Sequence, residues 1–189
     1  MTPKHHSLAE FLNIDSKIDI VDIGANPVDG IPPYKSLLES GLVHVIGFEP
    51  NPKALEILNS QKGPNETYLP FVIYDGTDQR LRVCVSSGMV SLLEPNADLL
   101  SYFHGFPEWG KVKVRLPVDT KRLDEVDESD NIDFLKIDIH GGELKVFQNG
   151  IERLRNCLVI HTEVNFLPMY EDQPLFSEIE LFLREHGFI

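Results

Sequence analysis

The sequence is short of several features, and each shortage argues against a class of protein. It has only two cysteines in 189 residues, Cys84 and Cys157. Each lies in an apolar run and their spacing matches no disulfide framework, so we expect two buried, reduced thiols. No apolar run approaches the roughly 18 residues needed to span a bilayer, and the N-terminal segment has no hydrophobic stretch like that of a signal peptide. We therefore expect a cytoplasmic protein without a membrane span.

Basic residues are also scarce. The chain has 17 Lys and Arg against 30 Asp and Glu, which gives a formal net charge of −13. A field of that sign repels phosphate backbones and anionic lipid headgroups, so we expect neither nucleic acid nor a membrane surface as a partner. A small molecule is the expected ligand, and the composition is compatible with a homo-oligomer.

The rest of the composition is that of an ordinary globular domain. Hydrophobic residues make up 42% of the chain and charged residues 25%, which is enough apolar material for a folded core. A chain of this length suits one domain. We predict a single domain over residues 1–189, with residues 1–17 as an N-terminal lead-in.

Segments typical of strands alternate with segments typical of helices. The expected strands are 18–23, 43–48, 68–74, 80–86, 111–116, 132–139 and 157–164. The expected helices are 33–40, 52–60, 143–149 and 176–185, and residues 119–126 are expected to form a short connector or helical turn. Such alternation implies right-handed βαβ units, and therefore an α/β fold with a doubly wound, mainly parallel sheet covered by helices on both faces.

A long irregular segment, residues 87–110, interrupts this alternation. It contains the apolar and aromatic residues Met89, Tyr102, Phe103, Phe106 and Trp109. Loops of that length are usually functional. The segment is therefore expected either to cover a ligand as a lid or to pack as a separate apolar cluster against the sheet.

The loop after the first strand, within VDIGANPVDG (21–30), lies where an open parallel sheet binds its ligands. The dinucleotide fingerprint G-x-G-x-x-G fails here, because Asn26 and Asp29 occupy its second and third glycine positions. A P-loop fails as well, because Gly30 is followed by Ile-Pro and not by Lys and Ser or Thr. S-adenosylmethionine remains, since it has no phosphate and its amino, sulfonium and ribose groups suit carboxylates and backbone carbonyls.

Acidic residues at the ends of three successive strands support this cofactor. Asp22 can accept from an amino-bearing or cationic group, Glu49 from both ribose hydroxyls, and Asp75 from the adenine amino group. Small residues beside Asp22 let the backbone approach a ligand closely. The predicted cofactor-binding residues are Asp22, Gly24, Ala25, Asn26, Glu49, Pro50, Asp75 and Gly76.

Together these stretches resemble the FkbM family of S-adenosylmethionine-dependent methyltransferases. The matching stretches are VDIGAN (21–26), GFEPNP (47–52), LVIHTEVNF (158–166) and above all IDFLKIDIHGGELKVFQNGIERL (132–154). The last resembles the family's signature strand and helix, Lys-Ile-Asp-x-Glu-Gly-x-Glu. The resemblance implies a Rossmann-like class I methyltransferase fold, S-adenosylmethionine as the cofactor, and O-methylation of a hydroxyl on a sugar or other small metabolite.

The sequence departs from the family pattern in three places. Pro27 stands where the family often has a small or apolar residue before a glycine. His140 replaces a frequent glutamate, and the chain ends at HGFI without the antiparallel hairpin that completes the family's fold. A sheet that stops at the strand 157–164 has an exposed edge. We therefore expect this chain to be a fragment, or a partner to cover that edge.

Catalytic candidates follow two neighbouring strands. Asp138 and His140 end one strand, and His161 and Glu163 end the next. Alternation puts each pair on one side of its strand, so the four groups can converge if the strands are adjacent. We predict His140 as the general base, because imidazole titrates near neutral pH, with Asp138 as a positioning group and Glu163 as a third catalytic residue. These groups could also hold a divalent metal, but no spacing is diagnostic and we predict none.

Two further charged residues lie in the same region. Lys136 is unusual in an apolar strand, and we expect it to pair with a neighbouring acid. Glu143 begins a helix, where it either interacts favourably with the helix N-terminus or contacts the substrate.

Two other functions stay open at this point. One is a non-catalytic binding or scaffold module that keeps the fold. The other is a nucleotide-sugar or dinucleotide enzyme of similar fold, which the missing glycine fingerprint argues against. Binding of S-adenosylhomocysteine or of NAD distinguishes these functions.

Overall fold

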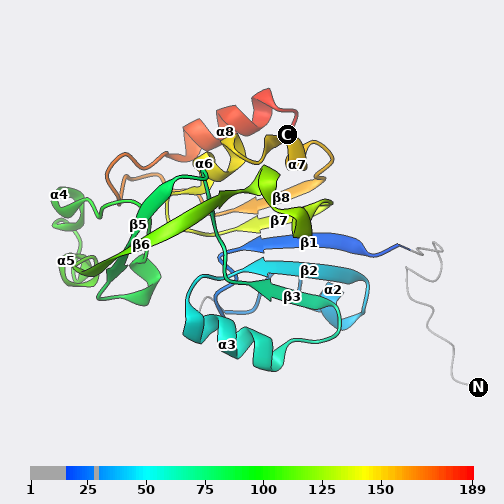
Figure 1. Ribbon diagram of the computed structural model, residues 1–189. Coiled ribbons are helices and arrows are strands. Elements are labelled where there is room, and N and C mark those ends of the chain that lie inside the picture. Colours follow the sequence, from blue (N-terminus) through cyan, green and yellow to red (C-terminus); the bar gives the residue numbers. More distant parts are fainter. Residues whose placement is uncertain (1–15, 28–29) are drawn as a thin grey trace, which may run out of the picture.

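The computed structural model describes residues 16–27 and 30–189, which form two β-sheets with helices packed around them (Figure 1). The larger sheet is entirely parallel and has the strand order β3-β2-β1-β7-β8. The smaller sheet has the order β4-β6-β5, in which β6 is parallel to β4 and antiparallel to β5. The predicted α/β class, with a mainly parallel Rossmann-like sheet, is confirmed.

The bounds of the elements are as follows. The larger sheet contains β1 (Ile18–Ile23), β2 (Val43–Phe48), β3 (Glu66–Leu69), β7 (Phe134–Ile137) and β8 (Val159–Thr162). The smaller sheet contains β4 (Val72–Tyr74), β5 (Asp78–Cys84) and β6 (Val112–Arg122). The helices are α2 (Lys35–Glu39), α3 (Pro52–Gln61), α4 (Ala97–Leu100), α5 (Phe106–Trp109), α6 (Glu143–Gln148), α7 (Ile151–Leu154) and α8 (Phe176–Glu185). Short 3₁₀ turns are η2 (Ser87–Met89), η3 (Leu123–Glu125) and η4 (Asp127–Ser129).

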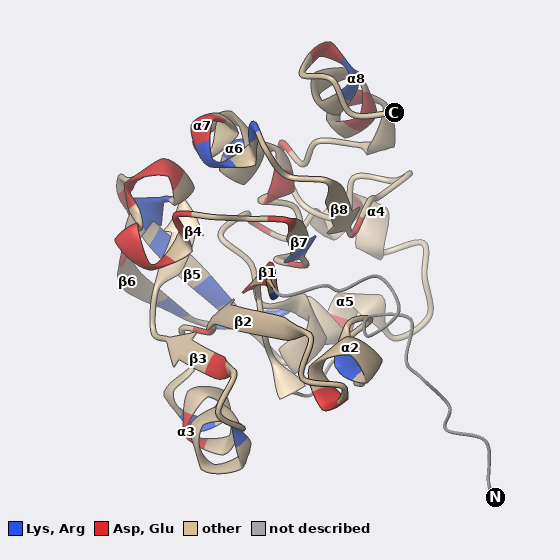
Figure 2. Cartoon of the chain, turned by 90° about the vertical axis from the view of Figure 1, so that its right-hand side faces the viewer, with Lys and Arg blue, Asp and Glu red and all other residues tan. Residues whose placement is uncertain are grey.

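The alternation of side chains along β1 separates the two faces of the larger sheet. Val21 and Ile23 pack into the main core together with residues of α6, α7 and α8. Ile20 packs on the opposite face against Tyr34, which directly precedes α2. Figure 2 shows the same layers: α6, α7 and the smaller sheet lie on one side of the larger sheet, and α2 lies on the other. Asp22 shares the face of Ile20, so its carboxylate is directed towards the α2 side.

Local capping signals located two helices well. The Asn51 side chain accepts from the N–H of Lys53 at 3.0 Å, and Pro52 is the first residue of α3, as predicted. The helix α8 spans the predicted residues 176–185, and Glu178 accepts from the N–H of Leu175 at 2.9 Å at its start.

The prediction of a single strand over residues 68–74 is wrong. The strand β3 ends at Leu69, β4 begins at Val72, and the two belong to different sheets. Pro70 lies between them and has no N–H to donate to a ladder, which favours a break in the pairing there. Asp75 and Gly76 therefore follow a strand of the smaller sheet, and not the third strand of the larger one.

The prediction of a connector that begins at residue 119 is also wrong. The strand β6 continues to Arg122, because β4 pairs with this part of it: Val72 lies opposite Thr120, and Tyr74 opposite Arg122. Pairing between segments so far apart in the sequence leaves no local signal. A helical turn does follow, as η3.

Residues 87–110 contain η2, α4 and α5 and lie beside the β5–β6 hairpin (Figure 1). Met89 and Leu100 from this segment are buried with Cys84 and Tyr170 in an apolar cluster separate from the main core. Tyr102 is 83% exposed. Of the two expectations for this segment, the separate apolar cluster describes its buried part.

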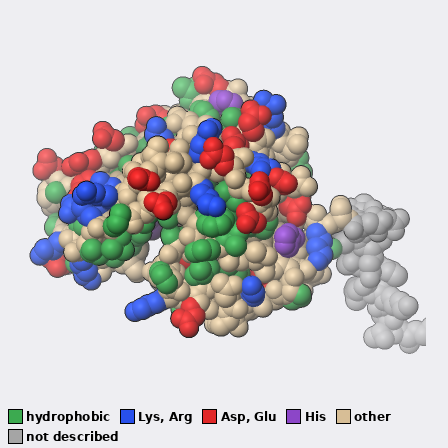
Figure 3. All heavy atoms as spheres, viewed as in Figure 1, with side chains coloured by type: hydrophobic (Ala, Val, Ile, Leu, Met, Phe, Trp, Pro, Cys, Tyr) green, Lys and Arg blue, Asp and Glu red, His purple; other side chains and the backbone are tan. Residues whose placement is uncertain are grey.

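The surface carries charged side chains of both signs. Acidic and basic side chains are both spread over the face shown in Figure 3, and one group of basic side chains lies at its left, on the side where Figure 1 places β5 and β6. The strand β8 is an edge of the larger sheet, as expected.

None of the helices in the described ranges is long and apolar enough to cross a bilayer. The predicted lead-in, 1–17, lies outside the described residues except for its last two.

Candidate active site

The loop after β1 is held against the loop after β7. Gly24 has a φ of 80°, a left-handed conformation that favours glycine. A Cβ at this position would lie 2.2 Å from the carbonyl oxygen of Asp138. The N–H groups of Gly24 and Ala25 donate to the carbonyl of Phe48 at 3.0 and 3.2 Å. The chain's own backbone thus requires a glycine at position 24, and the expected close approach of a ligand stays a prediction.

Asp22, Lys136 and Tyr34 form a buried ion-pair group on the α2 side of the sheet. Asp22 and Lys136 lie opposite each other in the register of β1 and β7, with Nζ 3.1 Å from Oδ1. The Tyr34 hydroxyl donates to Oδ2 at 2.6 Å. Lys136 also donates to the carbonyl of Gly24 at 2.8 Å. The predicted pairing of Lys136 with a neighbouring acid is confirmed, and the pair also fixes the glycine loop.

Burial controls the ionisation of this group. Asp22 is 3% exposed and Lys136 is 9% exposed. Burial raises the pKa of the Asp22 carboxyl, while Lys136 and Tyr34 oppose that shift. Burial and the Asp22 carboxylate raise the pKa of the Tyr34 hydroxyl, so the phenol stays protonated and donates. Both oxygens of Asp22 face groups of the protein, and its direct contact with a cofactor stays a prediction.

Glu49 directly follows β2, at the same end of the larger sheet as the loop after β1. Its side chain is buried, and Oε1 accepts from the N–H of Asn51 at 2.7 Å. The register of β1 and β2 pairs Ile23 with Phe48, so the chain leaves both strands at the same level. The structure therefore brings Glu49 and Pro50 to the end of the sheet where Gly24, Ala25 and Asn26 lie.

Asp75 and Gly76 lie in a turn between β4 and β5. Oδ1 of Asp75 accepts from the N–H of Thr77 at 3.0 Å and from its hydroxyl at 2.7 Å. Gly76 has a φ of 81°. These contacts stabilise the turn itself, and the expected contact of Asp75 with an adenine amino group stays a prediction.

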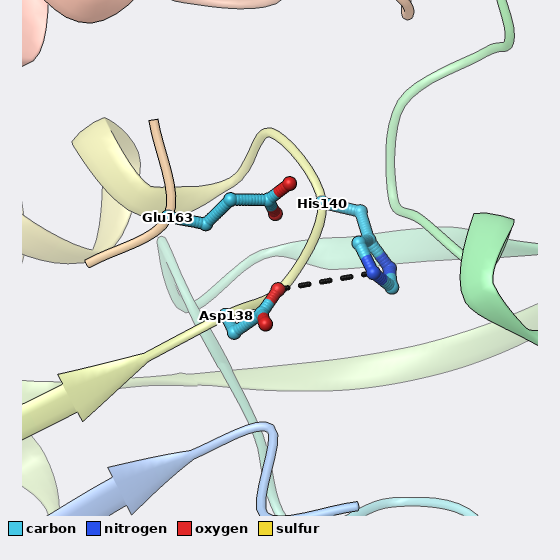
Figure 4. A group of neighbouring side chains, drawn as sticks. All are labelled: Asp138, His140 and Glu163. Atoms are coloured by element: carbon cyan, nitrogen blue, oxygen red, sulfur yellow. Dashed lines mark ion pairs between the residues drawn. The ribbon is translucent and has the colours of Figure 1, made fainter. Parts of the chain in front are cut away.

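Asp138, His140 and Glu163 form a compact group, the carboxylate–histidine cluster, at the carboxyl ends of β7 and β8 (Figure 4). One nitrogen or oxygen atom from each lies within 4.8 Å of the others. Nε2 of His140 is 3.8 Å from Oδ1 of Asp138. The structure thus brings together the three residues that the sequence predicted as catalytic.

His161, the fourth residue expected to converge, lies outside this cluster. The strand β8 ends at Thr162, and His161 is on its exposed side with Val159. Glu163 lies beyond the end of the strand, where alternation no longer fixes the direction of a side chain. His161 therefore does not join the group as expected, and the shorter strand leaves the side of Glu163 unfixed by alternation.

The segment 87–110 fixes the orientation of the His140 ring. Nδ1 of His140 lies 2.8 Å from the carbonyl oxygen of Val90. Because a carbonyl oxygen only accepts, Nδ1 carries a proton, and the neutral ring presents the lone pair of Nε2 towards Asp138. The hydroxyl of Ser91 donates to the backbone carbonyl of His140 at 2.7 Å.

The backbone around His140 is strained and tightly held. His140 has a φ of 58°, and Gly141 has a φ of 103°. A non-glycine residue in this region costs on the order of 1–3 kcal/mol, which the surrounding structure must offset. Glu143 is buried at the start of α6 and accepts from the N–H groups of Ile139 and Gly141 at 2.9 Å each. Glu143 therefore holds the loop at residues 138–142, which extends its expected role at the helix start.

Glu163 has a raised affinity for a proton in the folded cluster. Burial raises the pKa of Glu163 to about 8, and the neighbouring Asp138 and Glu143 act in the same direction. Oδ1 of Asp138 and Oε2 of Glu163 have no hydrogen-bond partner among the described residues. Near neutral pH the folded cluster therefore favours a proton on Glu163 and can exchange it.

Sequence reasoning missed Val90 and Ser91. The Val90 carbonyl accepts a hydrogen bond from the His140 ring, and the Ser91 hydroxyl donates one to the His140 carbonyl. Backbone contacts of this kind leave no residue signature, and only the unusual length of the 87–110 segment indicated a functional role.

Two surface hollows lie away from these groups. One, of about 340 Å³, is lined by residues of α7 and by the C-terminal residues His186 and Phe188. The other, of about 360 Å³, is lined by residues from α4, α5 and β6. Neither is lined by a residue predicted to bind the cofactor or to take part in catalysis.

Comparison with known proteins identifies a family. The family model described as the methyltransferase FkbM domain matches residues 22–189. No curated protein and no solved structure matches the chain. The matched range contains the loop after β1, the whole carboxylate–histidine cluster and nearly all of the larger sheet.

Proposed function

Because this chain belongs to the FkbM family of methyltransferases, we propose that it uses S-adenosylmethionine to methylate a hydroxyl of a small acceptor, such as a sugar or another metabolite. The observation that carries the proposal is the carboxylate–histidine cluster at the carboxyl ends of β7 and β8. Open parallel sheets bind their ligands at these ends. The cluster brings a proton-accepting imidazole to the edge of the sheet where an acceptor would meet the cofactor.

The residues after β1 and β2 suit this cofactor by their chemistry. Its amino, sulfonium and ribose groups call for carboxylates and carbonyls, and it needs no phosphate cradle. Glu49 offers its carboxylate to the ribose hydroxyls, and the loop at residues 24–26 lies at the same end of the sheet for backbone contacts. Asp22 acts through Lys136, which fixes the Gly24 carbonyl. Pro50, Asp75 and Gly76 are assigned to the nucleoside end.

The cluster activates the acceptor hydroxyl. Bound S-adenosylmethionine supplies a methyl group whose carbon–sulfur bond breaks, with its electron pair left on sulfur, as the oxygen–carbon bond forms. His140 accepts the hydroxyl proton at Nε2, because Nδ1 is already bonded to Val90. Asp138, 3.8 Å from Nε2, stabilises the imidazolium. A positioned base of this kind contributes about 10²–10⁴-fold to the rate, and alignment of the hydroxyl can contribute several kcal/mol more.

A transfer assay tests the proposal. The chain is incubated with S-adenosylmethionine that carries a labelled methyl group and with a panel of sugars and polyols. We expect label in at least one acceptor, and a rate at least about 100-fold lower in His140→Asn with unchanged affinity for S-adenosylhomocysteine. Binding of S-adenosylhomocysteine without transfer to any acceptor would support the non-catalytic module, and binding of NAD in its place would support the dinucleotide enzyme.

The cellular location and the partners of the protein are part of the same proposal. We expect it to act in the cytoplasm on a small molecule, without nucleic acid or a membrane as a partner, in keeping with its net charge of −13. Cell fractionation tests the location, and light scattering tests whether the chain forms a homo-oligomer.

A further inference from the structure

We infer that the carboxylate–histidine cluster is also a binding site for a divalent cation, with Asp138, His140 and Glu163 as its ligands. One donor atom from each residue lies within 4.8 Å of the others. A cation about 2.1 Å from each donor requires donor–donor distances of about 3–4 Å. The 3.8 Å between Nε2 of His140 and Oδ1 of Asp138 is already in that range, so small side-chain rotations complete the site.

The cluster contains two buried oxygens whose only donor is the proton that Glu163 can carry, and a cation would bind in place of that proton. Oδ1 of Asp138 and Oε2 of Glu163 have no hydrogen-bond partner among the described residues. Oδ1 of Asp138 lies 3.8 Å from Nε2 of His140, which carries no proton in the neutral ring, so this contact supplies no donor. Buried carboxylate oxygens are normally hydrogen-bonded, paired with a cation or bound to a metal. A divalent ion between the two carboxylates would satisfy both oxygens at once.

The His140 ring is already oriented as a metal ligand. Histidine ligands usually donate the N–H of their second ring nitrogen to a carbonyl or carboxylate, which fixes the tautomer and the ring direction. His140 makes such a bond from Nδ1 to the carbonyl of Val90 at 2.8 Å. Ser91 and Glu143 hold the surrounding backbone, so Nε2 is directed to the cluster before any ligand binds.

The ligand set indicates the class of cation. Carboxylates suit Mg²⁺, Ca²⁺ and Mn²⁺, whereas imidazole suits later transition metals. Mn²⁺ accepts both kinds of ligand, so Mn²⁺ is the expected type, with Mg²⁺ as a weaker competitor. Three protein ligands leave positions open for water or for an oxygen of the acceptor.

The role of the cation, unlike its binding, rests on the proposed methyl transfer. An acceptor hydroxyl at an open position would have its pKa lowered by the cation and would release its proton to solvent. Coordination uses the lone pair of Nε2, so the cation then replaces direct proton transfer to His140. The bonds made and broken in the transfer are unchanged.

Binding of Mn²⁺ alone tests the inference. The full chain, with no cofactor added, is titrated with Mn²⁺ while the signal of the free ion is followed by electron paramagnetic resonance. We expect about one tight site per chain and a Kd at least about 100-fold higher in Asp138→Asn and Glu163→Gln. His140→Asn should show the same loss, and asparagine tolerates the left-handed backbone at that position.

His44 offers a matched control. It forms a similar pair with Asp19, with Nδ1 3.5 Å from Oδ1, but belongs to no group of three ligands among the described residues. His44→Asn should leave the Mn²⁺ affinity unchanged. All proteins carry His5→Ala and His6→Ala, so that these two neighbouring histidines, which lie outside the described residues, do not contribute binding.

The outcomes separate this inference from the proposed function. Absence of Mn²⁺ binding at millimolar concentration, or equal binding by the cluster variants and the parent, overturns the inference. Thermal unfolding is measured with and without Mn²⁺ beside each titration. The cation should raise the Tm of the parent and of His44→Asn, and leave the Tm of the three cluster variants unchanged. Calorimetry with S-adenosylhomocysteine in the presence of a chelator tests the cofactor separately: Mn²⁺ binding without nucleoside binding keeps the cation site and removes the methyl transfer.

Discussion

The two charged groups on either side of Gly24 contain similar residues but differ in how their charges are satisfied. In the buried ion-pair group, Oδ2 of Asp22 accepts from Tyr34 at 2.6 Å, and Oδ1 faces the Lys136 ammonium at 3.1 Å. In the carboxylate–histidine cluster, Oδ1 of Asp138 faces Nε2 of the His140 ring at 3.8 Å, a longer contact to a group without a permanent charge. A buried network with its charges paired rigidifies a fold, whereas an incompletely paired one keeps its capacity for protons or ligands. The structural group and the candidate site thus differ both in pairing and in burial: the side chains of Lys136 and Asp22 are 11% and 4% exposed, and those of His140 and Asp138 are 23% and 31% exposed.

The largest effect on stability is expected when the buried ion-pair group loses its cation. Lys136→Met leaves the Asp22 carboxylate buried without its cation, which should lower the free energy of unfolding by about 3–5 kcal/mol. The double variant Asp22→Asn/Lys136→Met removes both charges and should recover most of that loss. Denaturant unfolding measures both. A single variant that costs less than the double variant would contradict the account of this group.

The next effect concerns Gly24, which joins the two groups. Gly24→Ala places a Cβ 2.2 Å from the Asp138 carbonyl oxygen on a residue with positive φ, and should cost more than about 2 kcal/mol of stability. Gly41→Ala is the control, because Gly41 has a similar φ of 75° and no atom within 4 Å of the added Cβ. Equal losses in the two variants would show that the contact between the two loops carries no cost of its own.

The pH dependence of stability tests the protonation of Glu163 in the carboxylate–histidine cluster. Glu163 has a pKa of about 8 when folded and an ordinary value of 4.5 when unfolded, so between these values the folded chain binds more protons. Wild-type stability should therefore decline as the pH rises through that window. Glu163→Gln should make this decline smaller when unfolding is measured in the presence of a chelator, while Asp22 and Glu143, whose pKa values burial also raises, still contribute. Parallel stability curves for the two proteins would show that Glu163 is not perturbed.

The smallest effect concerns the support of His140. Ser91→Ala removes the hydrogen bond to the His140 carbonyl and should cost about 1 kcal/mol of stability. Ser87→Ala, at an exposed position of the same segment, should change stability by less than about 0.5 kcal/mol. Equal costs would remove the role of Ser91 in supporting the candidate site.

The order of these elements was predictable where local signals were sufficient. The strands β1 and β2 and the helices α3 and α8 follow from apolar runs and caps, and Lys136 was conspicuous as a charge in an apolar strand. The break at Pro70 was readable from the missing N–H of proline, but which sheet each half joins depends on the distant strand β6.

The candidate site was predictable in its residue types more than in its contacts. The group formed by Asp138, His140 and Glu163 was expected from the ends of two neighbouring strands. The contacts of Asp22 with Tyr34 and of His140 with Val90 were not, because they join segments that no local pattern relates. The position of Glu163 relative to His161 was not predictable, because Glu163 lies beyond the end of β8, and the end of a strand is the least predictable part of an element.

In the proposed function, the carboxyl end of the larger sheet binds S-adenosylmethionine, with Glu49 on its ribose. The most direct measurement is calorimetry with S-adenosylhomocysteine on the wild type, on Glu49→Gln, and on Glu56→Gln as an exposed control on α3. We expect the wild type and Glu56→Gln to bind S-adenosylhomocysteine. Glu49→Gln should keep its stability and bind with an affinity at least about tenfold lower. No binding by the wild type, or equal affinity in Glu49→Gln, would contradict this proposal.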